Sequence, residues 1–318
     1  MLTIEMIQAA KKQLEPYLSK TPLLYNTTLS TYFGAKVSLK LECFQKTGSF
    51  KPRGAFNKML SLAPEQKQHG VVAVSGGNHA QGVAFAASTL GIDAVVCMPS
   101  STPENYLAAT RSYGATVLLT ENIHAAFRRA DELQQEGRTL VHPFDDPLVA
   151  AGQGTIGLEI LEDAPDATHV VVSIGGGGLF AGVGTALRAA NPHIKLTGVE
   201  TSGADAMAHA FAAGQPVELP AITSIARTLG APKVSPMTLH MARQFTKEIQ
   251  VVSDADTVKW LVFLLERAKV LAEPAAACCL AAADRLKGSF QPTDHLVILI
   301  CGGNAALSDL CGWKEMLK

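Results

Sequence analysis

The chain has 318 residues, of which 47% are hydrophobic and only 17% are charged, so a large share of it is suited to burial in folded domains. This composition excludes a disordered chain, a coiled coil and a mini-protein that depends on disulfides. The formal net charge of −1 provides no field that would attract nucleic acid or an acidic membrane, which favours a small-molecule partner. The longest apolar stretch, 275–283, is far shorter than the roughly 20 residues that span a bilayer.

The cysteines and the first residues of the chain indicate in which cellular compartment the protein resides. The six cysteines form no C-x-x-C pair and have no zinc-like spacing to histidines, so we expect reduced and mostly buried thiols. The first apolar stretch contains Glu5, which is typical of an amphipathic helix and not of a secretory signal. Both observations predict a cytoplasmic protein.

Short β-branched runs alternate with helical segments along the chain. In chain order we expect strands at 71–74, 94–97, 116–119, 139–141, 169–174, 194–199 and 295–300. Helices are expected between them, at 79–90, 103–113, 123–135, after 178 to 190, and at 256–271. Because the strands lack polar alternation, helices should cover both of their faces, as in a parallel sheet. The sequence therefore predicts an α/β fold with two open, mainly parallel twisted sheets flanked by helices.

Four unusual loops lie at or near the starts of expected helices. They are 47–54, 75–79, 175–178 and 301–304. Ligands on open α/β sheets bind beyond the carboxyl ends of strands, where such loops lie. The run Gly175–Gly178 lets the backbone approach a ligand closely, and the helix after it directs N–H groups and its positive dipole end to the same place. This run predicts a phosphate site.

Two cofactors fit a phosphate site here. Residues 176–181 also satisfy G-x-G-x-x-A, and Glu200 ends the next strand, where a dinucleotide site places its ribose acid. That nicotinamide alternative leaves the other three loops without a role. Lys51 begins a helix, where the dipole disfavours an ammonium and favours a nucleophilic amine. Such an amine forms a Schiff base with a carbonyl cofactor, so the pair of features predicts pyridoxal phosphate.

The four loops carry a resemblance to a known family. The stretches 49–54, 75–82, 175–179 and 301–304 resemble the signatures of fold-type II pyridoxal-phosphate enzymes, in the branch of serine/threonine dehydratases and serine racemases. Residues 142–147 and 151–155 are also similar to that branch, and the match extends over nearly the whole chain. The resemblance implies a fold like the β subunit of tryptophan synthase, with the site in an interdomain cleft. It also implies a homodimer. We expect a large domain of residues 1–51 and 147–318 and a small mobile domain of 52–146.

The resemblance also implies roles for particular residues. Lys51 would bind the cofactor covalently and act as the catalytic residue. The other cofactor contacts would be Phe50 on the ring face, Asn78 at the phenolic oxygen, Cys301 at the ring nitrogen, and Gly175, Gly176, Gly177, Gly178 and Leu179 at the phosphate. The substrate carboxylate would bind the loop that contains Ser75, Gly76, Asn78 and His79.

The implied activity is removal of water and ammonia from a β-hydroxy amino acid such as L-threonine or L-serine. The freed Lys51 would take the α-proton, the β-hydroxyl would leave as water with a proton supplied by the cofactor phosphate, and hydrolysis would give a 2-oxo acid and ammonia. A thiol at Cys301 gives the ring nitrogen no strong reason to stay protonated, which suits β-elimination better than transamination. The resemblance extends to Asp309 and leaves only nine residues after it, so we expect no appended regulatory domain.

Three positions depart from the pattern of the branch. Racemases carry a second serine where Gly76 stands, so we predict little racemase activity. A divalent-cation site would need an aspartate at Ala206 beside Glu200, so a cation is doubtful, and Glu200 is interpreted as a strand-end acid facing water. Arg227 replaces an acid of the branch, and with extra space at Gly76 it points to bulkier or anionic substrates such as phenylserine or 3-hydroxyaspartate. A non-catalytic cofactor-binding homologue stays open as well.

Overall fold

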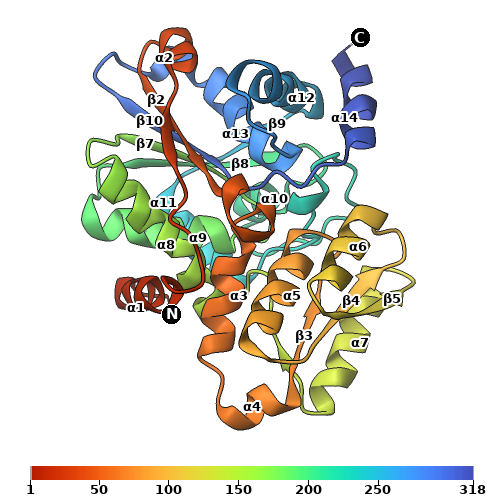
Figure 1. The fold of residues 1–318 in the computed structure, drawn as a ribbon. Helices are drawn as coiled ribbons and strands as arrows, with labels where there is room; N and C mark the ends of the chain where they lie inside the picture. The colour runs from red at the N-terminus through yellow and green to blue at the C-terminus, as the bar shows by residue number, and fades with distance from the viewer. Residues whose placement is uncertain (1, 318) are drawn as a thin grey trace.

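The computed structural model describes residues 2–317 and has an α/β fold with two mainly parallel sheets (Figure 1). The larger sheet has the order β1 (Leu23–Tyr25), β2 (Lys36–Leu41), β10 (His295–Ile300), β7 (His169–Ser173), β8 (Lys195–Thr201) and β9 (Ile249–Val252). Only β1 runs antiparallel to its neighbour. The smaller sheet is parallel throughout, in the order β5 (Thr116–Thr120), β4 (Ala94–Pro99), β3 (Val71–Val74) and β6 (Thr139–Leu140).

Helices cover both sheets, as the unbroken apolar strands predict. On the larger sheet, α13 (Pro274–Arg285) packs against four strands, while α9 (Gly178–Ala190) and α8 (Pro147–Asp163) form a pair that reaches the sheet through β7. On the smaller sheet, α7 (Ile123–Gln135) contacts all four strands, and α5 (Asn78–Leu90) packs against β3 and β4 beside α6 (Glu104–Ser112). The alanine-rich α13 is almost entirely buried, because its small side chains permit close approach to the strands.

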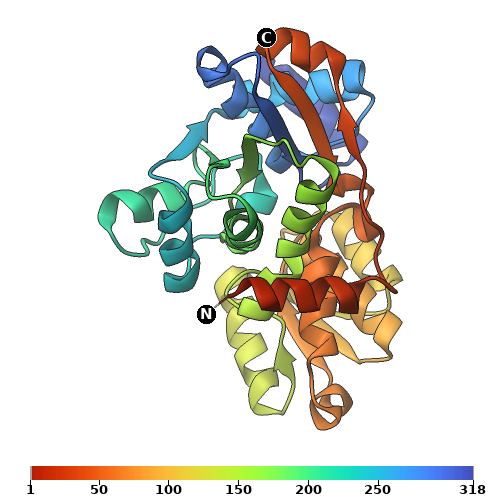
Figure 2. The ribbon, with the colours of Figure 1, turned by 90° about the vertical axis from the view of Figure 1, so that its left-hand side faces the viewer.

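One helix lies where the two halves meet. Helix α3 (Lys51–Leu60) packs against α5 of the smaller half and against α8 of the larger half, and α1 (Ile4–Leu14) also touches it (Figures 1 and 2). Asp146 caps α8 by accepting hydrogen bonds from the N–H groups of Leu148 and Val149, and Pro147 takes the first helical position. The remaining helices are α2 (Thr27–Phe33), α4 (Pro64–His69), α10 (Ala206–Ala213), α11 (Pro236–Phe245), α12 (Asp254–Phe263) and α14 (Leu307–Lys314).

Some expected elements differ from the structure. Strands β1, β2 and β9 were not predicted. The helix expected at 256–271 is α12, which continues as a π-helical turn over Leu264–Ala268 and ends at Lys269 with a φ of 59°. Leu265 on that turn is exposed and is not a core residue. Edge strand β5 is only partly covered, so the expectation of two covered faces is wrong there.

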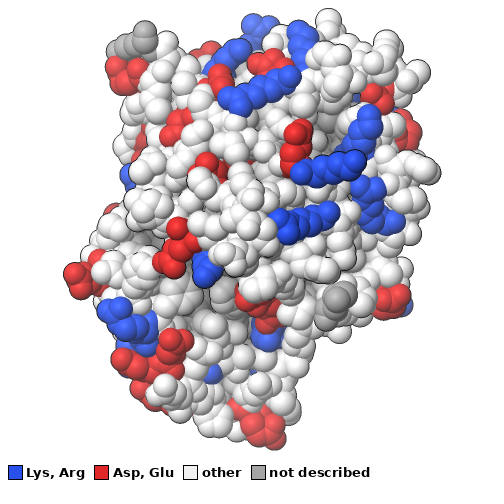
Figure 3. Space-filling view, turned by 180° about the vertical axis from the view of Figure 1, so that it is seen from behind, with Lys and Arg blue, Asp and Glu red and all other residues white. Residues whose placement is uncertain are grey.

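Charge is sparse on the surface. On the face shown in Figure 3, basic and acidic side chains are interspersed over a mostly uncharged surface. Among residues 2–317, no helix is both long and apolar enough to cross a membrane. Four of the six cysteines are buried, Cys43 is half-buried and Cys311 is exposed, and all six are free thiols, as expected apart from the exposure of Cys311.

Candidate functional site

A cavity lies at the carboxyl ends of β7 and β10, neighbouring parallel strands of the larger sheet. The chain turns away from the sheet after both strands. The first residue of α3, which lies between the two halves, and the first residue of α5, in the smaller half, also line the cavity. The lining residues come from seven separate segments. They are Phe50, Lys51, Asn78, Pro143, Phe144, Ser173, Gly175, Gly176, Gly177, Gly178, Leu179, Thr228, Leu229, Glu273, Ala275 and Cys301.

Lys51 is the first residue of α3, and its amine faces this cavity. Its Nζ donates to the carbonyl oxygen of Pro143 at 3.1 Å and lies 5.0 Å from the centre of the Phe50 ring. Burial lowers the pKa of Lys51 to about 8, although nearby Cys301 and Glu273 act in the opposite direction. A substantial fraction of this amine is therefore neutral near pH 8 and able to attack a carbonyl.

This pKa predicts how the rate of cofactor binding depends on pH. Only the unprotonated amine attacks a carbonyl, so the rate of covalent cofactor attachment to cofactor-free protein should rise with pH and reach half of its maximum near pH 8. The measurement is the growth of visible absorbance after mixing with pyridoxal phosphate between pH 6 and 9.5. A midpoint near 10.5, the ordinary value for lysine, would contradict this prediction.

The glycine loop Gly175–Gly178 joins β7 to α9 and accepts no side chain. A Cβ on Gly176 would lie 2.0 Å from the Phe144 ring, and one on Gly175 would lie 3.0 Å from the Leu229 carbonyl oxygen. Gly177 has a φ of 94°, which strongly favours glycine. The loop ends at the start of α9, whose first N–H groups have no partner within the helix. The geometry is that of an anion site at a helix N-terminus.

Asn78, the first residue of α5, belongs to a buried polar cluster. Its Nδ2 donates to the Glu273 carboxylate at 2.8 and 3.1 Å, and its Oδ1 accepts from Asn304 Nδ2 at 2.8 Å. Thr228 Oγ1 also donates to Glu273, at 2.8 Å. Burial raises the pKa of Glu273, and the hydrogen bonds from Asn78 and Thr228 oppose this rise.

Cys301 follows β10 and stands next to the end of β7. Ser173 Oγ donates to its sulfur at 3.4 Å, and the Phe50 N–H donates to its carbonyl oxygen at 3.1 Å. Burial raises the pKa of Cys301 well above the ordinary value of a thiol. Cys301 is therefore a neutral thiol, and its backbone holds the segment that carries Lys51.

The expected substrate loop, 75–79, lies at the start of α5. Ser75 Oγ accepts from the Gly77 N–H at 3.1 Å, and His79 Nε2 contacts the Val141 carbonyl oxygen at 2.7 Å. Burial lowers the pKa of His79 to about 3, so its ring is neutral, and its buried Nδ1 has no hydrogen-bond partner among the described residues. The extra space expected at Gly76 is absent, because a Cβ there would lie 2.7 Å from Thr102 Oγ1.

Glu200, the acid considered for a cation or a ribose, has another function in the structure. It is fully buried at the end of β8, so the expectation that it faces water is wrong. Its two carboxylate oxygens accept from the N–H groups of Met207 and Ala208, both at 2.8 Å, at the start of α10. Burial raises the pKa of Glu200 to about 8. Both oxygens thus accept hydrogen bonds from a helix N-terminus, and among the described residues no group of three or more His, Cys, Asp or Glu could join Glu200 in holding a metal ion.

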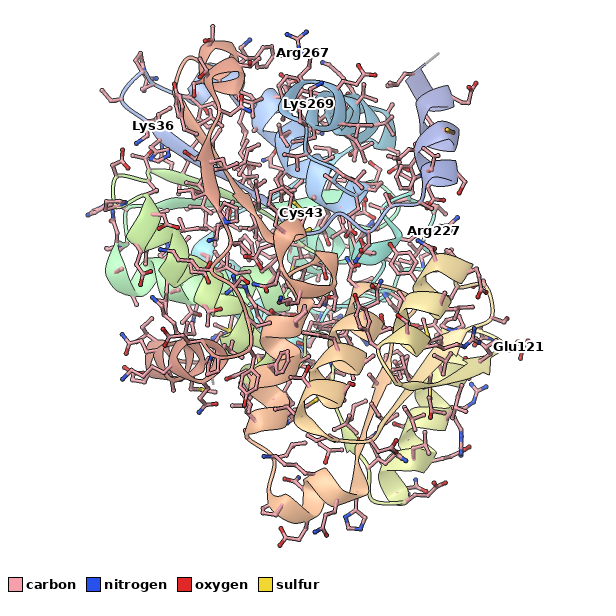
Figure 4. All side chains as sticks on the ribbon, in the orientation of Figure 1. Lys36, Cys43, Glu121, Arg227, Arg267 and Lys269 are labelled. Atoms are coloured by element: carbon pink, nitrogen blue, oxygen red, sulfur yellow. The ribbon has the colours of Figure 1, made fainter. Side chains whose placement is uncertain are left out.

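The lining of the cavity differs from the expected site: of the expected substrate-binding residues only Asn78 is in it, whereas Ser75, Gly76 and His79 are not. Arg227 is exposed, beside α6 in Figure 4, and is not among the residues that line the cavity. Its neighbour Thr228 points into the cavity instead, and Phe144 and Ser173 also line it. Phe144 lies in the stretch 142–147, but nothing in that stretch indicates that the Phe144 ring packs on the glycine loop.

Known proteins match this chain over most of its length. The sequence profile described as "Pyridoxal-phosphate dependent enzyme" matches residues 14–302. The chain belongs to this family of pyridoxal-phosphate dependent enzymes. It is 41% identical over 306 residues to the L-threonine ammonia-lyase of Thermotoga maritima, an alignment that covers 96% of this chain and 76% of the relative.

Two further members of the family match over nearly their whole length. The catabolic L-threonine dehydratase of Staphylococcus aureus is 39% identical over 314 residues, which covers 97% of this chain and 91% of the relative. The structure of maize serine racemase superposes with a TM-score of 0.93 at 35% identity, covering 99% of this chain and 97% of the other. These matches confirm the fold-type II architecture and the pyridoxal phosphate cofactor.

The residues of the cavity fit this cofactor of the family. The glycine loop forms a cradle that a side chain would fill, and it suits a phosphate. Lys51 is the amine on the cavity wall, and the neutral Cys301 thiol and the Asn78 amide suit uncharged and anionic ring atoms respectively. The nicotinamide alternative is not supported, because the buried Glu200 carboxylate is paired with α10.

A buried ion-pair cluster anchors α3 just beyond Lys51. Arg53 donates to Glu42 from Nε and Nη2, each at 2.8 Å, and to Glu159 from Nη1 at 2.7 Å. Lys40, which is completely buried, donates to Glu159 at 2.6 Å. Two cations and two anions thus connect α3 with β2, the turn after β2, and α8, and they fix the helix that carries Lys51.

Proposed function

We propose that this chain catalyses pyridoxal-phosphate-dependent β-elimination of a β-hydroxy amino acid such as L-threonine or L-serine, giving a 2-oxo acid and ammonia. The observation that carries the proposal is the agreement between the site and its relatives. Relatives with 39–43% identity are named as L-threonine ammonia-lyases or dehydratases, and this chain has an amine, a phosphate cradle and a polar amide around one cavity.

We assign the cofactor contacts as follows. Gly175–Gly178 and Leu179 would hold the phosphate, Phe50 would pack on the ring face, Asn78 would donate to the phenolic oxygen, and Cys301 would face the ring nitrogen. Bound pyridoxal phosphate supplies a carbonyl that binds amines covalently and a ring that withdraws electrons from the α-carbon. The chain must then orient the substrate and move its protons.

Lys51 is the base of this proposal. Its amine lies in the cavity at 3.1 Å from the Pro143 carbonyl oxygen, which accepts one N–H and directs the nitrogen. Burial lowers the pKa of Lys51, so that the neutral amine is available to take the α-proton of the substrate. The Pro143 carbonyl then stabilises the ammonium that results.

The loop 75–79 is assigned to the substrate carboxylate. It lies at the N-terminus of α5, where N–H groups and the helix dipole favour an anion. Ser75 Oγ is already bonded to the Gly77 N–H, which keeps the loop in one shape. His79 is neutral and adds no charge, so its contribution is limited to hydrogen bonding.

The neutral thiol of Cys301 favours elimination. It has no negative charge with which to hold a proton on a ring nitrogen, so electrons from the α-carbon are withdrawn less strongly. A reaction in which the electrons leave at once with the β-hydroxyl suits this arrangement. Gly76 provides no acid or base on the opposite face, which disfavours racemisation.

The proposal also covers the motion of one domain and the oligomeric state of the protein. We infer that residues 52–146 form a small mobile domain that closes on a large domain of 1–51 and 147–318 and excludes water from the reaction. We also infer a cytoplasmic homodimer, and the free cysteines support a reducing compartment. Sedimentation of the purified protein measures the oligomeric state directly.

The substrate proposal is tested by release of 2-oxo acid and ammonia from a panel of β-hydroxy amino acids, with and without a chelator. We expect the highest kcat/KM with L-threonine or L-serine, because Thr102 fills the space beside Gly76 and Arg227 lies outside the cavity lining. Activity should survive chelation, because Glu200 is paired with α10. A clear preference for phenylserine or 3-hydroxyaspartate would overturn the substrate choice, and efficient conversion of L-serine to D-serine would overturn the reaction type.

A further inference from the structure

We propose that Glu273 and Asn304 are positioning residues that hold the Asn78 amide in one orientation, and that Tyr106 connects this amide to α6. The proposal rests on the role assigned above to Asn78 at the phenolic oxygen of the cofactor. Neither Glu273 nor Tyr106 reaches the reacting atoms in this proposal, so both act through Asn78.

The orientation of Asn78 follows from its two partners. The Glu273 carboxylate is a pure acceptor and faces Asn78 Nδ2, whereas Asn304 Nδ2 is a donor and faces Asn78 Oδ1. Turning the amide over would place oxygen against the carboxylate and nitrogen against nitrogen. Both contacts would become repulsive, so only one orientation is allowed. Asn78 Nδ2 has two hydrogens and both contacts at 2.8 and 3.1 Å are to one carboxylate, so the proposal assigns one N–H to Glu273 and the other to the cofactor.

Glu273 is itself held in place from several sides. It is 2% exposed and occupies the N-cap position of α13, although its side chain makes no capping hydrogen bond, and it lines the cavity. Thr228 Oγ1 donates to one of its oxygens, and the Asn304 N–H donates to the other at 3.2 Å. Gly302 lies against it closely enough that an added Cβ would be 3.0 Å from Glu273 Cδ and 3.1 Å from Asn78 Nδ2. The carboxylate therefore has little room to rotate.

Tyr106 extends the network to the smaller half. Its hydroxyl donates to the Asn304 carbonyl oxygen at 2.5 Å, and its side chain is 9% exposed. Tyr106 belongs to α6, which packs on α5 and β5 in the smaller half, whereas Asn304 follows β10 of the larger sheet. Movement of α6 away from this loop would break the bond and loosen Asn304, which holds Asn78. The position of α6 is thereby coupled to the amide.

Glu273→Gln tests the first part, because it keeps the shape of the side chain and removes the charge. We expect a shifted visible absorption maximum of the bound cofactor and a cofactor Kd raised about tenfold or more, as for other supporting residues around ligand groups. Glu273→Asp restores the charge at shorter reach and should recover part of the loss. Glu266→Gln, an exposed carboxylate on the preceding turn, is the matched control and should match the parent in both measurements.

Tyr106→Phe tests the second part, with Tyr113→Phe at the end of the same helix as its control. We expect Tyr106→Phe to shift the absorption in the same direction as Glu273→Gln, and the double variant to show less than the sum of the two effects because both act through Asn78. The control should leave the spectrum unchanged. A Tyr106→Phe spectrum identical to the parent overturns the connection to α6.

These measurements need no substrate, so they are independent of the proposed lyase reaction. If Glu273→Gln changes only the thermal unfolding and leaves the spectrum and cofactor Kd at parental values, Glu273 is merely structural and the proposal is wrong. If Asn78→Ala keeps the parental spectrum, the role of Asn78 itself is wrong. Failure of the whole substrate panel with these shifts present would instead overturn the proposed function and leave this inference intact.

Discussion

Lys51→Ala should fold, lose its covalently bound cofactor and lose turnover by at least about 10³-fold. The amine lines the same cavity as the glycine loop, and burial lowers its pKa. Its removal takes away covalent attachment and the proposed base together. Folding should persist, because among the described residues the amine makes a single hydrogen bond, to the Pro143 carbonyl oxygen. The measurements are visible absorbance after dialysis, 2-oxo acid formation and the unfolding temperature.

Lys46→Ala supplies the control for this variant. Lys46 is exposed, lies a short distance before Lys51 and is not among the residues that line the cavity. Its replacement should leave absorbance and turnover at parental values. A Lys51→Ala protein that keeps both its visible band after dialysis and normal turnover would contradict the assignment of Lys51.

Arg53→Met should lower the free energy of unfolding by about 3–5 kcal/mol, the range observed when one partner of a buried ion pair is removed. Arg53 is 2% exposed and satisfies carboxylates of both Glu42 and Glu159. Methionine fills similar space but leaves the four-residue cluster with a net negative charge in the interior. Lys40 still neutralises Glu159 and limits the loss. Denaturant unfolding of the cofactor-loaded protein measures the difference.

The effect of Arg53→Met should also depend on pH. Arg53 is among the groups that lower the pKa of Glu159 in the parent, and so its contribution to stability is present above the unfolded pKa of that carboxyl, near 4.5. This contribution is lost as pH falls through the lower folded value, so the gap between parent and variant should narrow in acid. Arg111→Met, which removes an exposed pair with Glu104 at 3.7 Å, is the control and should change stability by less than about 1 kcal/mol. Equal unfolding midpoints for the two variants would refute the role of the cluster.

The sequence predicts the longer apolar runs, and misses the three-residue β1 and the strands β2 and β9, which contain polar residues. The run 295–300 matches β10 to the residue, because all six positions are buried. Strand β2 carries Lys36 and Lys40, so it lacks an unbroken apolar run. Lys40 is in fact completely buried, and its partner Glu159 is 119 positions away in the chain, so no local pattern reveals the pair.

The site residues divide in the same way: some are recognisable from their neighbours in the chain, and others are placed only by the fold. The loops rich in glycine, and Lys51 at a helix start, are visible in sequence because their chemistry depends on neighbours in the chain. Thr228 was missed and Arg227 was chosen, because the short 3-10 turn at Arg227–Leu229 decides which of two adjacent residues points inward. Phe144 covers the glycine loop only after the chain has returned from β6 to α8, which is a consequence of topology.

The position of α3 has a mechanical consequence. This helix touches both α5 and α8, and its first residue is Lys51, while Arg53 ties it to the larger half. In the proposed closure, Lys51 stands at the junction between the large domain and the mobile residues 52–146, where displacement is least. The loop 75–79 belongs to the mobile residues and would move with them. The Lys51 nitrogen would then stay in place while the anion-binding loop moves toward it and away from it. Substrate capture would depend on the moving loop, and proton abstraction on the stationary amine.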